Sequence, residues 1–133
     1  MSRALALDYG SARCGAAVSD PTGTLATPID PVERPGSDAG LARIAELVRE
    51  RDVETVVVGL PLTLAGGESE QTVEARAFAE RLAEIVAPVP VRLHDERLTT
   101  AQARRAGGSA SEDSRAAAHL LQAWLDGPER DAR

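Results

Sequence analysis

The first apolar run of the chain, ALALDYG at residues 4–10, predicts a short buried strand that ends in a carboxylate. Four consecutive apolar residues favour a strand that is covered on both faces. Asp8 follows them directly, and Gly10 lets the chain turn sharply behind it. An ionised carboxylate at the edge of a core is costly to desolvate unless a cation or hydrogen bonds compensate. Asp8 is therefore either a turn residue bonded to its own backbone or part of a functional site.

The segments after this strand predict an antiparallel meander. Small residues at positions 12–19 suit a second strand that pairs tightly with the first. Residues 20–23 (DPTG) carry Pro at the second position and Gly at the fourth, which indicates a type I turn. A third strand is expected around residues 24–29, followed by a Pro-rich connector over residues 30–36.

Further strands and helices alternate in the rest of the chain. Apolar runs at residues 55–58 and 89–93 predict two buried strands, each preceded by a helix. A short helix over residues 99–105 and a last helix from about Glu112 to Asp126 follow. A meander followed by right-handed crossovers gives an α/β fold with a mixed five-stranded sheet, in which antiparallel and parallel strands carry helices on both faces.

The helices are predicted from their caps and their apolar spacing. Ser37 is the expected cap of the first helix, and the second opens near Ser69. Thr99 and Gln102 form a capping box for the short helix. The expected inward-facing stripes are Leu41, Ile44, Ala45 and Val48 in the first helix; Ala75, Phe78, Ala79, Leu82, Ile85 and Val86 in the second; and Ala117, Leu120, Leu121 and Trp124 in the last.

Size and composition limit the classes of protein to consider. At 133 residues the chain can form one domain with its own core, expected over residues 1–126, and a polar, frayed tail over residues 127–133. Every side chain with a fixed positive charge is an arginine, and the net charge of -6 argues against a nonspecific basic surface for nucleic acid. One Phe, one Trp and one Tyr are too few for stacking on single-stranded bases to be the main binding mode.

The same composition bears on compartment and chemistry. The single cysteine excludes a disulfide or a cysteine-based zinc site within the chain. No signal peptide precedes the first strand, and no apolar run approaches the ~20 residues that a membrane span needs. A cytoplasmic protein without membrane contacts is therefore expected.

Three acidic positions are expected at one rim of the sheet. Sites in such sheets form where parallel strands end, and Asp8 ends the first strand while Asp95 and Glu96 end the fifth. Asp113 lies four residues before Ala117, so it continues the buried stripe of the last helix toward the rim. Converging carboxylates would raise each other's pKa unless a divalent cation neutralised them. Oxygen-only ligands point to Mg²⁺ or Mn²⁺, and two such ions ~4 Å apart would suit phosphodiester hydrolysis.

Each of these acidic residues also has a structural explanation. Asp113 could cap the last helix or act as a first-turn carboxylate that the helix dipole favours. Either Asp95 or Glu96 could be the ligand, with the other as a structural partner, because adjacent strand residues point to opposite faces.

The basic residues near the rim have two interpretations as well. Arg13 and Arg97 could hold a phosphate oxygen, or they could form ordinary salt bridges with Asp20 and Asp95. His94 is expected to be a hydrogen-bonded residue at a strand end, with a role as a ligand as the alternative. The residues expected to be solvated are His119, Arg104 and Arg105.

Several blocks of sequence resemble those of the YqgF/RuvX family, in the same order and over nearly the whole chain. They are residues 5–10 (LALDYG) with Arg13, Gly15 and residues 19–20 (SD); residues 58–61 (VGLP); residues 67–71 (GESEQ); residues 95–100 (DERLTT); and the helix over residues 113–126. The resemblance implies an RNase H-like fold related to the RuvC resolvases. It also implies a metal-dependent nuclease with Asp8, Glu96 and Asp113 as its catalytic and metal-binding set. The candidates for nucleic-acid contacts are Arg13, Arg97, Thr99 and Thr100.

The family is described both as a pre-16S rRNA nuclease in ribosome maturation and as a Holliday junction resolvase. The implied substrate is thus a structured rRNA precursor or branched DNA, with ribosomal particles as a further partner. A symmetric junction needs two coordinated cuts, so the resolvase reading requires a homodimer, whereas RNA processing is compatible with a monomer.

The chain departs from the pattern of the family in one place and from that of the RuvC-like enzymes in another. Residues 108–112 (GSASE), just before Asp113, contain none of the lysines that family members often carry there, and Glu112 stands as a competing ligand. The strand at residues 55–61 lacks the acidic residue of the RuvC-like enzymes, so Glu96 would have to replace it.

Two functions of other classes are also compatible with parts of the sequence. Actin-like phosphotransferases open with a similar strand pair, but they clamp ATP between two such domains and this chain has room for one. A catalytically silent scaffold that binds RNA or ribosomal protein would not need three carboxylates at the rim.

Overall fold

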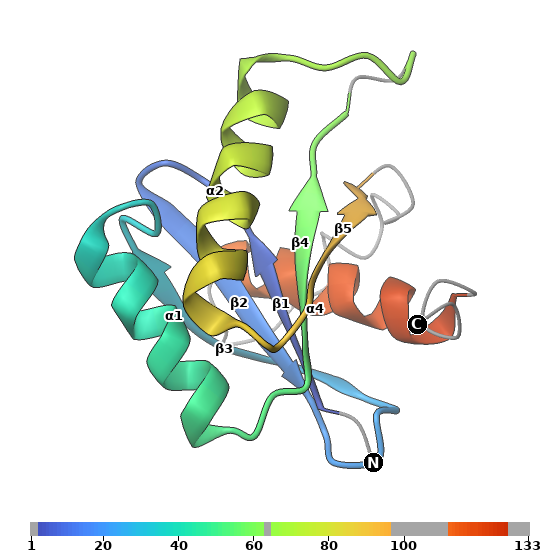
Figure 1. The fold of residues 1–133 in the computed structure, drawn as a ribbon. Helices are drawn as coiled ribbons and strands as arrows, with labels where there is room; N and C mark the ends of the chain where they lie inside the picture. The colour runs from blue at the N-terminus through green and yellow to red at the C-terminus, as the bar shows by residue number, and fades with distance from the viewer. Residues whose placement is uncertain (1–2, 63–64, 97–111, 128–133) are drawn as a thin grey trace.

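The computed structural model describes residues 3–62, 65–96 and 112–127, which form a five-stranded sheet between helices (Figure 1). The elements in chain order are β1 (Ala4–Asp8), β2 (Arg13–Ser19), β3 (Ala26–Glu33), α1 (Asp38–Glu50), β4 (Thr55–Leu60), α2 (Glu70–Val86), β5 (Val91–Asp95) and α4 (Glu112–Asp126). The strand order is β3-β2-β1-β4-β5. β1 pairs antiparallel with β2 and parallel with β4, and β4 pairs parallel with β5, as expected for a mixed sheet.

Helices cover the sheet from both sides. In Figure 1, α1 and α2 lie in front of the sheet and α4 crosses behind it. The side chains of β1 alternate between the two cores: Leu5 and Leu7 join the cluster under α1 and α2, whereas Ala4 and Ala6 join the cluster under α4. The expectation that this strand is buried on both faces is confirmed, since all four residues are at most 2% exposed.

The expected helix starts are confirmed by their hydrogen bonds. The Ser37 side chain accepts from the backbone N–H of Gly40 at the start of α1. Ser69 forms a capping box with Thr72 at the start of α2. One prediction for α2 is wrong: Ile85 was expected to face inward, but it is 47% exposed. The helix therefore buries a narrower stripe than its apolar residues suggest.

The third strand is longer than its sequence pattern predicts. β3 extends through residues 30–33, which were expected to be a connector. Its register shifts between Cys14 and Ala16 of β2, so Asp30 and Pro31 together lie opposite Gly15. Prolines are tolerated here because β3 is an edge strand, and a bulge removes the need for a ladder hydrogen bond from Pro31.

The fifth strand also differs from its prediction. It was expected to be buried over residues 89–93, but it runs from Val91 to Asp95 at the other edge of the sheet. Its position at the edge leaves Leu93 36% exposed. The short helix expected over residues 99–105 and the tail beyond residue 127 lie outside the described residues.

Within the described part of the chain, no helix has both the length and the apolar character that a membrane span requires.

Candidate active site

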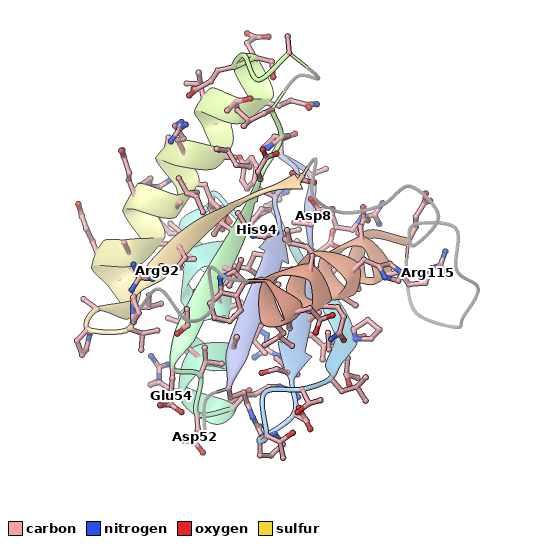
Figure 2. The ribbon with its side chains drawn as sticks, turned by 90° about the vertical axis from the view of Figure 1, so that its right-hand side faces the viewer. Asp8, Asp52, Glu54, Arg92, His94 and Arg115 are labelled. Atoms are coloured by element: carbon pink, nitrogen blue, oxygen red, sulfur yellow. The ribbon has the colours of Figure 1, made fainter. Side chains whose placement is uncertain are left out.

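The side chain of Asp8 lies on the face of the sheet that α4 covers. Alternation along β1 puts Asp8 on the side of Ala4 and Ala6, which pack under α4. On the neighbouring β4, Val57 belongs to the same cluster, so Gly59 faces the same side. Gly59 comes one residue after Val58, the partner of Leu7, and therefore lies next to Asp8. Figure 2 shows Asp8 and His94 at the same end of the sheet.

Glu96 reaches this face from β5 by crossing Gly59. A Cβ atom placed on Gly59 would lie 2.9 Å from Cγ of Glu96 and 3.0 Å from a methyl carbon of Leu120 in α4. The stem of Glu96 thus occupies the space that a side chain at residue 59 would need. Asp95, the neighbour of Leu60 in the β4–β5 register, points to the opposite face by alternation. The structure accordingly places Glu96, and not Asp95, on the face of Asp8.

Asp113 is brought to the same region by a close contact between α4 and β2. A Cβ atom on Gly15 would lie only 1.9 Å from the carbonyl oxygen of Asp113, so this approach requires glycine. Gly15 is itself the antiparallel partner of Asp8. The buried side chain of Ser114 accepts a hydrogen bond of 3.3 Å from the backbone N–H of Ala16. These two contacts fix the first turn of α4 beside the end of β1.

Arg13 forms an ion pair with Asp113, not with Asp20. Its Nε lies 3.2 Å from Oδ2 of Asp113, and the two side chains are 57% and 46% exposed. The expected pairing with Asp20 is wrong because Asp20 has local partners. Its carboxylate accepts hydrogen bonds from the backbone N–H groups of Thr24 and Leu25 and from the hydroxyl of Thr22. These bonds lower the pKa of Asp20 to about 2.

The negative charges of Asp8 and Asp113 act on one buried thiol. Cys14 is completely buried under the opposite face of the sheet. Burial is the main reason that the pKa of this thiol is raised well above its usual value, and the charges of Asp8 and Asp113 raise it further. Both carboxylates are thus close enough to influence the same side chain, although they come from the two ends of the fold.

Tyr9 secures the end of β1 from the other side of the sheet. Its ring lies against that of Phe78 in α2, with 4.8 Å between ring centroids. Partial burial raises the pKa of Tyr9, and the charges of Glu74 and Cys14 raise it further. This contact holds the residue next to Asp8 in the core and so restricts where the Asp8 backbone can move.

The carboxylates share a face and an end of the sheet but do not form a ready-made metal site. Among residues 3–62, 65–96 and 112–127, no three His, Cys, Asp or Glu side chains are grouped closely enough to hold a metal ion. The donor chemistry nevertheless suits a hard cation, since Asp8, Glu96 and Asp113 offer oxygen ligands only. Glu112, the competing candidate, is the exposed first residue of α4.

The remaining candidates are placed as follows. His94 is buried, 2% exposed, and pairs with Gly59 in the β4–β5 register. His119 is half-buried on α4. The candidates that lie outside the described residues are Arg97, Thr99, Thr100, Arg104 and Arg105.

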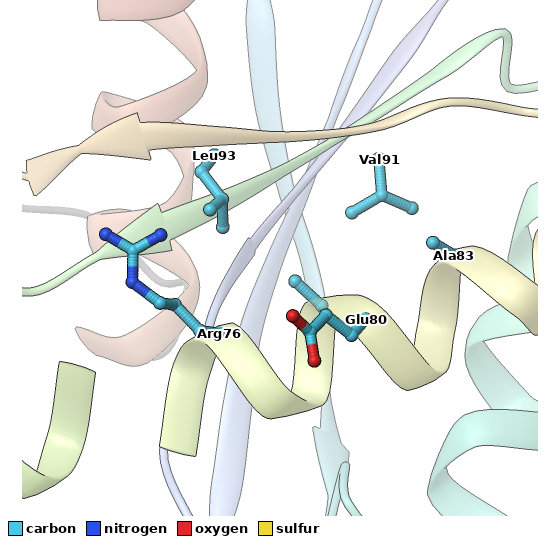
Figure 3. Close-up of a pocket in the computed structure, with 6 residues that line it drawn as sticks. Arg76, Glu80, Ala83, Val91 and Leu93 are labelled. Atoms are coloured by element: carbon cyan, nitrogen blue, oxygen red, sulfur yellow. The ribbon is translucent and has the colours of Figure 1, made fainter. Parts of the chain in front are cut away.

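A shallow hollow of about 170 Å³ lies on the other side of the sheet, between α2 and β5 (Figure 3). Its lining residues are Arg76, Ala79, Glu80, Ala83, Val91 and Leu93. Val91 packs against the core under α1 and α2, so the hollow opens away from the face that carries Asp8. It is separate from the candidate active site.

Comparison with known proteins shows the family of this chain. The sequence model of a family described as "RuvX: Holliday junction resolvase" matches residues 2–127. The chain belongs to the RuvX family. A protein of Mycobacterium leprae (strain Br4923) named "Putative pre-16S rRNA nuclease" is 50% identical, over 93% of this chain and 72% of that protein. A Mycobacterium tuberculosis protein (strain ATCC 25177 / H37Ra) of the same name is 47% identical, over 93% of this chain and 78% of that protein.

A solved structure supports the expected fold class. Thermus thermophilus RuvC, described in complex with a Holliday junction substrate, superposes with a TM-score of 0.59 at 16% identity, over 93% of this chain and 94% of that chain. At this identity the likeness shows the fold, and it confirms the RNase H-like class. Family membership confirms the resemblance drawn from the sequence and identifies the chain as a nuclease, a phosphodiester hydrolase.

The glycines were the part of the site that sequence reasoning did not interpret. Gly15 and Gly59 were noted within motifs, but not that each makes room for an acidic residue. The signal was present as glycine in or next to a buried strand, which often marks the close approach of another segment. The partner segments are far away in sequence, so the pattern alone does not name them.

Proposed function

We propose that this nuclease depends on divalent metal ions, that Asp8, Glu96 and Asp113 are its catalytic carboxylates, and that it matures the 5′ end of 16S rRNA in the cytoplasm. The observation that carries the site assignment is the pair of glycine contacts. Gly15, the strand partner of Asp8, lets Asp113 approach closely, and Gly59 admits Glu96 to the same face. Three carboxylates from β1, the end of β5 and α4 thereby share one end of the sheet.

The three residues differ in how firmly the fold holds them. Asp8 is held most firmly, because β1 is paired on both sides and Tyr9 is anchored beyond it. Asp113 is fixed by the docked first turn of α4, whereas Glu96 follows an edge strand on a longer side chain. Two Mg²⁺ or Mn²⁺ ions held by these oxygens would supply activation of the attacking water and charge stabilisation of the leaving oxygen.

The RNA substrate is proposed from the names of the mycobacterial relatives. The net charge of -6 adds a weaker argument, because an acidic protein gains little from nonspecific phosphate contacts. A partner such as a ribosomal particle would then contribute to substrate binding.

Cleavage of four-way DNA junctions is the second candidate. The description of the family and the substrate bound to T. thermophilus RuvC favour it. This function requires a dimer that presents two active sites to one junction.

The test is a cleavage assay with both substrates, in Mn²⁺ and in Mg²⁺. Precursor 16S rRNA ends and a synthetic four-way junction are presented to the wild type, to Asp8→Asn and to Asp52→Asn. Asp52 is the matched control because it lies at the opposite end of the sheet (Figure 2) and its positive φ of 52° is one that Asn adopts readily. We expect Asp8→Asn to lose RNA cleavage by about a thousandfold or more, the scale seen when a group acting in the transition state is removed.

The other outcomes separate the alternatives. Paired symmetric nicks in the junction would establish the resolvase, and no cleavage of either substrate would contradict nuclease activity of the isolated chain. Thermal unfolding of Asp8→Asn checks that the fold persists. Loss of cleavage in Glu112→Gln with activity retained in Asp113→Asn would move the ligand on α4 to Glu112.

A further inference from the structure

The ion pair between Arg13 and Asp113 occupies a proposed metal ligand. Nε of Arg13 lies 3.2 Å from Oδ2 of Asp113. Under the proposed function this carboxylate must bind a divalent cation. A guanidinium at hydrogen-bond distance and a divalent cation repel each other, so the two compete for this carboxylate.

The backbone, rather than chance contact of long side chains, brings this pair together. Arg13 and Gly15 are two residues apart on β2 and therefore face the same side. Since Gly15 touches the backbone of Asp113, Arg13 is held opposite the Asp113 side chain. Glu33 lies directly across from Arg13 in the β2–β3 register, yet the ion pair that forms is with Asp113.

The exposure of the pair makes exchange of partners easy. Both side chains are about half exposed, and ion pairs in such positions change an equilibrium by no more than about fivefold. A divalent cation can therefore displace Arg13 at little cost. The released guanidinium keeps its charge and its planar set of donors, which match two phosphate oxygens.

We propose that Arg13 neutralises Asp113 in the metal-free protein and transfers to a phosphate of the nucleic acid when a divalent cation takes the carboxylate. This inference rests on the proposed function for the identity of the metal ligand. Arg13 is thus a positioning residue that couples the two binding events: metal makes the arginine available, and phosphate keeps it away from Asp113.

The first test measures Mn²⁺ binding by calorimetry, with no nucleic acid present. Arg13→Gln removes the competitor, so we expect it to bind Mn²⁺ up to about fivefold more tightly than the wild type. The matched control is Arg43→Gln, which removes an exposed arginine that pairs with Glu46 on α1. Equal affinities in the wild type and Arg13→Gln would overturn the inference.

The second test measures binding of a labelled 16S precursor fragment in EDTA, where no metal is available. Asp113→Asn releases Arg13, so this variant should bind the RNA more tightly than the wild type, and the double variant Arg13→Gln/Asp113→Asn should lose the gain. Glu112→Gln is the control, because it makes the same charge change at the neighbouring residue. Equal gains in Asp113→Asn and Glu112→Gln would show that charge alone is responsible and would overturn the proposal.

The two tests distinguish failure of this inference from failure of the proposed function. If the wild type binds no Mn²⁺, the metal-dependent mechanism is wrong, while the EDTA experiment still decides whether Arg13 moves to phosphate. Mn²⁺ that binds to the wild type and not to Asp8→Asn would support the metal-dependent mechanism. If the Arg13→Gln substitution then changes neither the Mn²⁺ affinity nor the RNA binding of Asp113→Asn, the mechanism stands and the proposed role of Arg13 is wrong.

Discussion

Gly15 is the residue at which the strand and the helix of the candidate site touch. A methyl group there would meet the carbonyl oxygen of Asp113 at 1.9 Å, so Gly15→Ala must push α4 away from β2. We expect a loss of about 1–3 kcal/mol in the free energy of unfolding, as for other overpacked sites. Cleavage in Mn²⁺ should fall more than stability alone explains, because Asp113 moves with the helix. Urea unfolding and the cleavage assay measure both effects.

Gly36→Ala is the matched control for this substitution. The nearest atom to a Cβ at residue 36 is the hydroxyl oxygen of Tyr9 at 3.6 Å, an ordinary contact. This variant should keep the activity and lose no stability. Equal losses of stability and cleavage in Gly15→Ala and Gly36→Ala would show that the contact between Gly15 and α4 is not the cause.

Asp20 gives the fold a pH dependence that is independent of the active site. Its pKa is lowered from 3.8 to about 2 by hydrogen bonds from Leu25, Thr22 and Thr24 that favour the ionised form. A depressed pKa stabilises the folded state above pH 3.8, and this contribution disappears as the pH falls through about 2. Asp20→Asn should therefore be less stable than the wild type at pH 6, and the difference should shrink between pH 4 and pH 2.

Urea unfolding of the wild type and of Asp20→Asn between pH 6 and pH 2 measures this difference in stability. A difference that stays constant down to pH 2 would mean that the charge of Asp20 plays no part in holding the turn between β2 and β3.

At the level of elements, α4 is attached to the sheet at both of its ends. Near its start, Ser114 accepts from the N–H of Ala16, beside the bulge of β2. Near its end, the Gln122 side chain donates to the carbonyl of Thr24 and accepts from the N–H of Ala26. The two attachments are similar in kind, but only the first adjoins Asp113.

We expect Ser114→Ala to reduce both stability and cleavage. The substitution takes an acceptor from the buried N–H of Ala16, which costs about 1–3 kcal/mol. Gln122→Ala should cost about 1 kcal/mol and leave cleavage unchanged, because its bonds are more exposed and distant from the carboxylates. Urea unfolding and cleavage rates of the two variants test this difference, and equal effects on cleavage would contradict it.

The elements that local patterns describe well were predicted closely. The caps at Ser37 and Ser69 and the last helix follow from signals within a few residues, and the structure confirms them. The end of β3 was missed because its extension depends on pairing with β2, which overrides the poor strand preference of Pro28 and Pro31. Exposure of Ile85 and Leu93 likewise depends on which elements lie nearby.

For the candidate site, too, local patterns predicted the positions of residues but not the contacts between distant segments. Strand ends and helical spacing put Asp8 and Asp113 at one rim of the sheet. They left the choice between Asp95 and Glu96 open, and only the family resemblance favoured Glu96. The structure gives the physical reason for Glu96 in the space above Gly59, and it gives the partner of Arg13 through the approach at Gly15. Both are contacts between distant segments, which no local pattern contains.

For the whole molecule, the net charge of -6 leads us to expect few phosphate contacts and therefore a weak response of binding to salt. Binding that uses one to three phosphate contacts releases few counterions, so the slope of log affinity against log salt should be shallow, about -1 to -3. Titration of a labelled RNA at several NaCl concentrations, with Ca²⁺ held constant, measures it. A slope steeper than about -5 would reveal an extensive basic surface and contradict this view.

The hydrogen bond between Ala16 and Ser114 joins residues that are 98 positions apart. During translation β1 therefore leaves the ribosome long before α4 is made. A growing chain already contains Asp8, but it lacks Asp113 until α4 has been synthesised and docked. If Asp113 is a catalytic carboxylate, as proposed, nascent and prematurely terminated chains should be unable to cut nucleic acid until α4 is in place.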